Sequence, residues 1–131
     1  MSRPLVALVD DHPDAREIYV TMLEQSGYAV VHGESGAAVL DILHRHRPSV
    51  LVMHVGLPDI DGVELCRRIR HHPMFRAMPV IAISGWGSGP RGARLREADF
   101  TELLLKPVRV EHLLEVVRRW AGAPGLPAMA V

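Results

Sequence analysis

Short apolar runs alternate along the chain with segments in which apolar residues recur every three or four positions. The runs have the length of β-strands and cover residues 5–9, 29–32, 50–55, 80–84 and 103–105. The segments that follow them have the spacing of amphipathic helices. Their predicted buried faces are Ala15, Ile18, Tyr19 and Met22; Gly36, Val39, Leu40 and Leu43; Gly62, Leu65, Cys66 and Ile69; and Leu113, Val116, Val117 and Trp120. The helix before the last run should be short, because Gly89, Pro90 and Gly92 crowd its start.

Strand and helix in regular alternation predict an α/β domain with one doubly wound parallel sheet and helices on both faces. Strands without polar positions, such as residues 5–9, suit a sheet that is covered on both sides. We expect this domain to take residues 1–121. Residues 122–131 have no periodicity, and we expect this Pro/Gly-containing tail to fray.

Composition narrows the functional classes. The chain has 131 residues, of which 48% are apolar, enough for one globular domain. Lys plus Arg and Asp plus Glu both number 15, so the chain has no net charge with which to hold nucleic acid. No apolar run approaches the roughly 20 residues of a membrane helix. With one cysteine and no signal-like N-terminus, we expect a cytoplasmic protein.

The candidate chemistry lies where the predicted strands end. Asp10 and Asp11 follow the first strand, His54 closes the third, Ser84 closes the fourth, and Lys106 follows the fifth. The carboxyl ends of parallel strands meet at one edge of a sheet, which is where such folds bind ligands. Acids, a hydroxyl and an ammonium there suit an oxygen-liganded cation beside a phosphoryl group. A simpler interpretation is that Asp10 and Asp11 only cap the first helix.

Four motifs in this arrangement carry a family resemblance. They are Leu8-Val9-Asp10-Asp11, the segment from Gly56 to Gly62, Ile83-Ser84-Gly85 and Leu105-Lys106-Pro107. From about residue 5 to residue 120 the chain resembles the response-regulator receiver domains of two-component signalling.

This resemblance implies a flavodoxin-like (βα)5 fold with strand order 2-1-3-4-5. It implies Mg²⁺ at Asp10 and Asp11, phosphoryl contacts from Ser84 and Lys106, and a cis peptide bond before Pro107. It also implies a signalling module rather than an enzyme, with a sensor histidine kinase or another signalling protein as partner. Partners or a second copy would bind the face formed by the fourth helix, fifth strand and fifth helix, where Arg91, Arg94 and Arg96 lie.

The sequence departs from the family pattern at the residue that decides its chemistry. Receiver domains are phosphorylated on an aspartate eight residues before the glycine that matches Gly62, and this chain has His54 there. An aspartyl phosphate cannot form on histidine, and imidazole is a poor ligand for Mg²⁺, which should therefore bind weakly or not at all. Leu103 stands where the family has a switch tyrosine, another aromatic residue or a histidine. Asp99 replaces a glycine, which predicts a left-handed backbone at that position.

Several roles for His54 remain open at this level. It is an inert side chain that fills the pocket, a pH-responsive group, or a ligand for a transition metal together with Asp10 and Asp11. Alternatively, His54 itself or the nearby Asp59 accepts a phosphoryl group. His12 lies close enough in sequence to overhang the same pocket. We expect Cys66 and Trp120 to be core residues.

Overall fold

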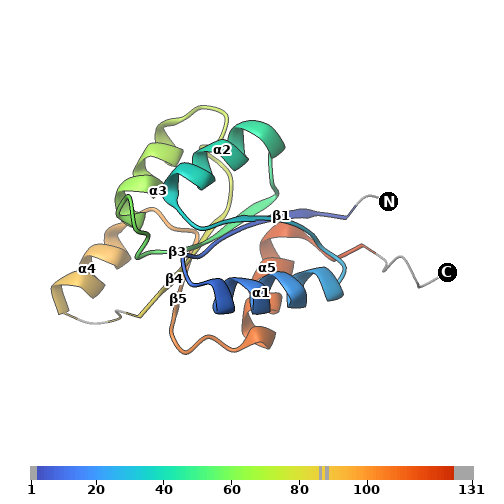
Figure 1. The fold of residues 1–131 in the computed structure, drawn as a ribbon. Helices are drawn as coiled ribbons and strands as arrows, with labels where there is room; N and C mark the ends of the chain where they lie inside the picture. The colour runs from blue at the N-terminus through green and yellow to red at the C-terminus, as the bar shows by residue number, and fades with distance from the viewer. Residues whose placement is uncertain (1–2, 86, 88, 126–131) are drawn as a thin grey trace.

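The computed structural model describes residues 3–85, 87 and 89–125, and its centre is a parallel β-sheet (Figure 1). The strands are β1 (Leu5–Val9), β2 (Ala29–Gly33), β3 (Val50–His54), β4 (Val80–Ser84) and β5 (Glu102–Leu105). They pair in the order β2-β1-β3-β4-β5, and every pair is parallel. The expected flavodoxin-like topology is confirmed. The apolar runs predicted the ends of these strands to within one residue.

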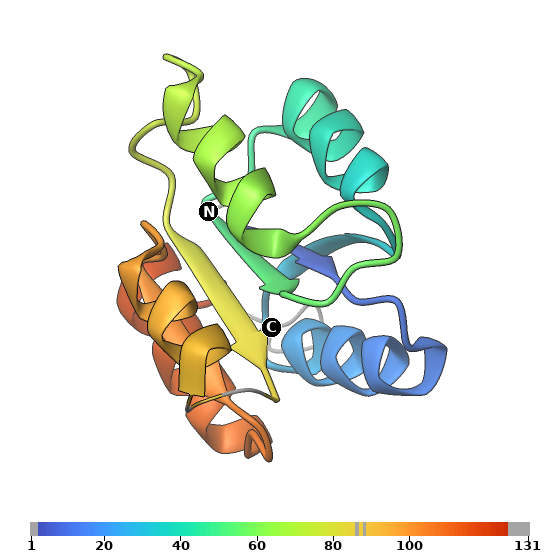
Figure 2. The same cartoon turned by 90° about the vertical axis from the view of Figure 1, so that its left-hand side faces the viewer.

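The helices that follow the strands cover both faces of the sheet. They are α1 (Pro13–Gln25), α2 (Gly36–His46), α3 (Gly62–His71), α4 (Gly89–Glu97) and α5 (Val110–Ala121). Helices α2 and α3 pack on one face, and α1 and α5 pack on the other (Figure 2). The α4 helix has only nine residues, as its glycines predicted, and it contributes Leu95 to a smaller cluster beside β4.

The two faces of β3 illustrate how the core is divided. Leu51 and Met53 point toward α2 and α3, whereas Val50 and Val52 point toward α1 and α5. All four side chains are fully buried. A strand that is apolar on both faces is held between two helical layers, because burial on either face removes apolar surface from water.

The predicted helix faces need three corrections. Ile18 is 55% exposed and Leu40 is 36% exposed, because Leu23 and Ile42 fill the core in their places. The face of each helix is therefore rotated slightly from the prediction. Trp120 is not a core residue either. It is 41% exposed in the last turn of α5, where its indole N–H donates a hydrogen bond to Glu102 Oε2.

The backbone at Asp99 also differs from expectation. Among the described residues other than glycine, only Arg47 has a positive φ, at 54° in the C-cap of α2. Asp99 is therefore not left-handed. Its carbonyl oxygen accepts hydrogen bonds from Cys66 Sγ and Arg70 Nε, and these bonds fix the turn before β5 without the conformation that favours glycine.

The beginning of the predicted tail packs against the domain. Tyr28 Oη donates a hydrogen bond of 2.9 Å to the carbonyl of Gly122, and Gly125 N–H donates one of 3.1 Å to the carbonyl of Gly27. The expectation of a frayed tail is therefore wrong for residues 122–125, while residues 126–131 lie outside the described part of the chain. None of the described helices has both the length and the apolar character needed to cross a membrane.

Candidate functional site

The sheet register brings the predicted site residues to one edge. Asp10 follows β1, and its N–H donates to the Gly33 carbonyl at the end of β2. His54 ends β3, directly beside β1, and pairs with Ile83 of β4. Ser84 ends β4, and its carbonyl accepts a 2.8 Å hydrogen bond from the N–H of Lys106. The five residues predicted from the strand ends therefore lie at the carboxyl edge of the sheet.

Two carboxylates and two imidazoles form a tight cluster at this edge. His12 Nδ1 lies 3.3 Å from Asp10 Oδ1 and 3.3 Å from Asp11 Oδ1. His54 Nδ1 lies 3.4 Å from Asp11 Oδ1. The His12 and His54 rings meet edge to face, with their centroids 5.5 Å apart. We call these four residues the His–Asp cluster.

Burial within the cluster is graded from its floor to its rim. The side chains of Asp10 and His54 are 4% and 11% exposed, whereas that of His12 is 61% exposed. Two of the enclosed atoms, Asp11 Oδ1 and His54 Nδ1, have no hydrogen-bond partner among the residues that the structure describes, although they face one another. A buried polar atom without a partner is costly, so this pair needs a physical explanation.

Electrostatics keeps His54 in its neutral form. Burial is the main cause that lowers its pKa below the ordinary histidine value, and the positive charge of Lys106 lowers it further. The carboxylates of Asp10 and Asp11 act in the opposite direction but do not outweigh these effects. At neutral pH the imidazole therefore has a lone pair available on one ring nitrogen.

Helix capping does not account for the two acids. His12 is the N-cap residue of α1, and its side chain makes no capping hydrogen bond. Asp10 Oδ1 instead accepts the His12 N–H at 2.9 Å, and the Asp10 carbonyl accepts a 2.8 Å bond from Arg16 Nη1. The interpretation of Asp10 and Asp11 as caps is therefore wrong. These bonds hold the loop after β1 so that both carboxylates turn toward β3.

Asp59 is held at the start of another helix. Its carboxylate accepts hydrogen bonds from the N–H groups of Gly36, at 2.7 Å, and Ala37, at 3.0 Å. These two bonds lower the pKa of Asp59 below its ordinary value. The structure therefore places Asp59 as a cap of α2 and outside the His–Asp cluster.

Leu103 lies in β5, and Pro107 lies in the loop that follows this strand. Leu103 packs against the cluster of Val55, Ala82 and Leu95, and its side chain has no group that could hydrogen-bond to a hydroxyl. The peptide bond between Lys106 and Pro107 is cis, as the resemblance implied.

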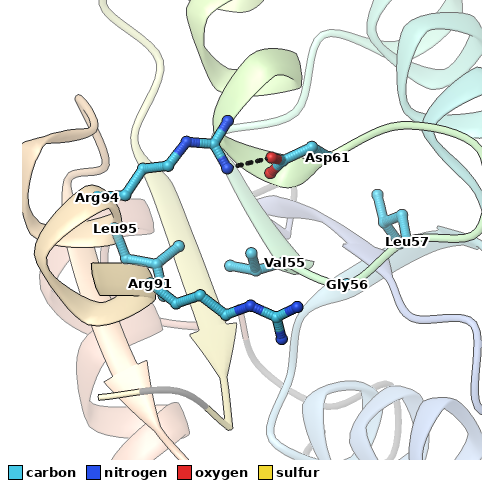
Figure 3. Close-up of a pocket in the computed structure, with 7 residues that line it drawn as sticks. All are labelled: Val55, Gly56, Leu57, Asp61, Arg91, Arg94 and Leu95. Carbon is cyan, nitrogen blue, oxygen red and sulfur yellow. Dashed lines mark hydrogen bonds and ion pairs between the residues drawn. The ribbon is translucent and has the colours of Figure 1, made fainter. Parts of the chain in front are cut away.

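A pocket of about 230 Å³ lies beside the site, between the loop after β3 and α4 (Figure 3). Arg94 reaches across it to pair with Asp61, which also accepts the Val63 N–H as the N-cap of α3. Arg91 extends over the same opening (Figure 3). The sequence indicated only an exposed arginine face here, because the pairing with Asp61 depends on how α4 docks.

The donor set does not fit the Mg²⁺ that the resemblance implied. Mg²⁺ requires oxygen ligands in near-octahedral geometry, and the cluster offers imidazole nitrogens from His12 and His54 beside its carboxylates. The position that would supply a third carboxylate is His54. Mg²⁺ is therefore a poor match for these donors.

His12 is the site residue that sequence reasoning placed least well. It was expected only to overhang the pocket, yet its ring nitrogen contacts both carboxylates. The available signal was its position two residues after Asp10, at the start of a helix. The direction of an N-cap side chain depends on the turn that precedes the helix, and the residue pattern does not specify that turn.

Comparison with known proteins gives a consistent assignment. The sequence model of the response regulator receiver domain matches residues 6–118. The polar-differentiation response regulator DivK of Brucella anthropi is 26% identical over 117 residues, which cover 89% of this chain and 95% of that protein.

Among solved structures, the receiver domain of the sensor histidine kinase PA1611 from Pseudomonas aeruginosa PAO1 is 26% identical, with a TM-score of 0.84 over 94% of this chain and 100% of that one. That structure is described with a magnesium ion coordinated in its active site cleft. The signal receiver domain of a histidine kinase from Syntrophus aciditrophicus is 28% identical, with a TM-score of 0.85 over 98% of both chains. With a family match over most of its length and this fold, the chain belongs to the response regulator receiver domain family.

Proposed function

We propose that this receiver domain signals through protein–protein contacts and does not accept a phosphoryl group at residue 54. The observation that carries the proposal is His54 at the end of β3, in a framework that otherwise keeps Asp10, Asp11, Ser84 and Lys106 at the same edge of the sheet. An acyl phosphate forms only on a carboxylate. Imidazole at this position therefore removes the acceptor and leaves the fold in place.

Two further features support a mode that is independent of phosphate. The PA1611 receiver domain is described with magnesium in its cleft, whereas the donor set of this chain has imidazoles that Mg²⁺ does not favour. Leu103 packs into an apolar cluster and offers no polar group that could respond to Ser84. We therefore propose that this chain differs from the family in two ways. Residue 54 does not become phosphorylated, and Leu103 of β5 does not respond to Ser84.

The face formed by α4, β5 and α5 is the proposed contact surface. β5 is an edge strand, and Leu105 on it is 46% exposed. Trp120 on α5 is 41% exposed, and its indole ring is fixed by Glu102 of β5. Exposed aromatic and aliphatic side chains on a rigid surface are typical of protein contacts. We propose that a sensor histidine kinase, another signalling protein or a second copy binds here, in the cytoplasm, without catalytic turnover by this chain.

The acceptor chemistry is tested by intact-mass spectrometry after incubation with acetyl phosphate and Mg²⁺. We expect no added phosphoryl group on the natural chain and one on His54→Asp, because the introduced carboxylate attacks phosphorus and releases acetate. The variant His54→Asn is the matched control. It has the size of the aspartate without a carboxylate and should stay unmodified.

Phosphoryl addition to the natural chain would contradict the proposal and show that another residue accepts it. Stability of the adduct in acid and base separates an acyl phosphate from a phosphohistidine, and Asp59→Asn tests the alternative acceptor that the sequence suggested. If His54→Asp also stays unmodified, other differences from the family besides His54 must prevent phosphorylation of this domain.

A further inference from the structure

We propose that Asp10, Asp11, His12 and His54 form a binding site for a divalent transition-metal ion, with Zn²⁺ as the best match. The site goes beyond the proposed function, and it rests on the geometry of the His–Asp cluster rather than on how the domain signals. Its ligands come from two segments, the loop after β1 and the last residue of β3.

Distances within the cluster match those between the ligands of one tetrahedral ion. One donor atom from each of the four residues lies within 4.8 Å of the other three. A tetrahedral zinc ion with bonds of about 2.0–2.1 Å holds its ligands about 3.3–3.4 Å apart. Three pairs are already at this separation: His12 Nδ1 is 3.3 Å from Asp10 Oδ1 and 3.3 Å from Asp11 Oδ1, and His54 Nδ1 is 3.4 Å from Asp11 Oδ1. The remaining pairs lie within 4.8 Å, and small rotations of the cluster side chains would bring them to the same separation.

The two buried atoms that lack a hydrogen-bond partner among the described residues provide a second observation. Asp11 Oδ1 and His54 Nδ1 are both buried and face one another at 3.4 Å without forming a hydrogen bond. A cation bound between them would satisfy both atoms at once, since each can donate an electron pair to a metal. In a preformed ion site, the ligand atoms are buried without a hydrogen-bond partner until the ion binds, and these two atoms fit that description.

The charges and supporting bonds of the loop also suit a divalent ion. The carboxylates of Asp10 and Asp11 together balance a charge of two. Hydrogen bonds from the His12 N–H to Asp10 Oδ1 and from Arg16 Nη1 to the Asp10 carbonyl hold the loop in shape, as the outer partners of metal ligands usually do. The positive charge of Lys106 near His54 opposes a cation, but Lys106 is exposed, so solvent screens its charge.

The donor types select the metal. Imidazole suits Zn²⁺, Cu²⁺ and Ni²⁺, whereas Mg²⁺ prefers oxygen ligands alone. Two nitrogen and two oxygen donors at tetrahedral separations favour Zn²⁺ over the ions that prefer square-planar geometry. The exposed His12 ring at the rim gives the ion a path from solvent.

The test is isothermal titration calorimetry of the tag-free chain with ZnCl₂ and, separately, with MgCl₂. We expect one Zn²⁺ per chain and no detectable heat with Mg²⁺. His12→Ala and His54→Asn should each weaken Zn²⁺ binding at least tenfold, and His112→Ala, on the exposed face of α5, should leave it unchanged. In His54→Asp the preference should shift toward Mg²⁺, because the new donor is an oxygen.

Imidazole ¹⁵N chemical shifts give a second readout that does not depend on affinity. Zn²⁺ should shift the Nδ1 resonances of His12 and His54 and leave those of the other histidines in place. Far-UV circular dichroism and thermal unfolding establish that each variant is folded. Unchanged Zn²⁺ binding in the folded His12→Ala and His54→Asn variants, or no Zn²⁺ binding by the natural chain, would overturn the proposal.

Discussion

At the scale of single residues, what surrounds a side chain determines its chemistry here more than its type does. Asp10, Asp11 and Asp59 are all near strand ends, yet two of them face an imidazole and the third caps α2. His12 and His54 differ in the same way, one at the rim and the other enclosed. Neighbouring charges and hydrogen bonds account for these differences.

Cys66 provides a test at this scale. Burial raises the pKa of its thiol to about 11, and the side chain is 1% exposed with Sγ 3.4 Å from the Asp99 carbonyl. Because the thiolate is the reactive form, the raised pKa keeps Cys66 protonated and unreactive well above neutral pH. We expect iodoacetamide at about pH 8 to leave the native chain unlabelled over a time that fully labels the urea-unfolded chain.

Intact mass before and after quenching measures this labelling. Rapid alkylation of the native chain, at the rate of the unfolded one, would show that α3 opens or that the thiol is not enclosed. The buried position of Cys66 was predictable from its place on the α3 face, but its contact with Asp99 was not, since that contact joins segments 33 residues apart.

At the scale of elements, the residue pattern located strands better than helix faces. A strand buried on both sides shows as an unbroken apolar run, such as residues 50–53, and its limits are therefore clear. A helix buries only one side. One exposed apolar residue therefore shifts the buried face that the sequence pattern predicts. Ile18 did so in α1, where Tyr19, Val20 and Leu23 make the contacts with the core. The polar site residues were predictable because they directly follow these apolar runs, whose ends are clear in the sequence.

Gly62 at the start of α3 allows a test of how closely this helix packs against the end of β3. A Cβ there would lie 2.8 Å from both Cα and O of Val55, so the first turn of α3 could not remain against the end of β3. We expect Gly62→Ala to lower the free energy of unfolding by about 1–3 kcal/mol, the usual cost of overpacking. Urea denaturation followed by circular dichroism measures the change.

Gly85→Ala is the matched control, because no described residue beyond its chain neighbours lies within 4 Å of a Cβ at that exposed position. Its effect should stay within about 0.5 kcal/mol. Equal stabilities for the two variants would mean that the loop between Val55 and Gly62 moves aside at little cost.

At the scale of the whole molecule, the segment after α5 packs against the turn between α1 and β2. After α5, Gly122 and Gly125 bond to Tyr28 and Gly27 at the turn before β2. Gly27 has a φ of +102°, and a Cβ on it would lie 2.3 Å from the Gly125 carbonyl oxygen, so this contact requires glycine. The residue pattern did not reveal it, since backbone-to-backbone contacts leave no hydrophobic period.

Truncation tests the importance of this closing contact. Removal of residues 122–131 deletes both hydrogen bonds, each worth about 0.5–1.5 kcal/mol, and should lower the free energy of unfolding by about 1–3 kcal/mol. Removal of residues 126–131 alone keeps both bonds and serves as the control. Chemical denaturation of the two shortened chains beside the full chain measures the difference, and equal losses would show that the contact is not what stabilises the fold.

The His54 position also has a genetic consequence. Histidine and aspartate codons differ only in their first base, so one nucleotide separates the imidazole at the end of β3 from a carboxylate. The strand that precedes it is buried by its own apolar side chains and does not depend on which of the two residues closes it. A single-base change in the gene can therefore exchange the imidazole at the end of β3 for a carboxylate while the strand stays buried.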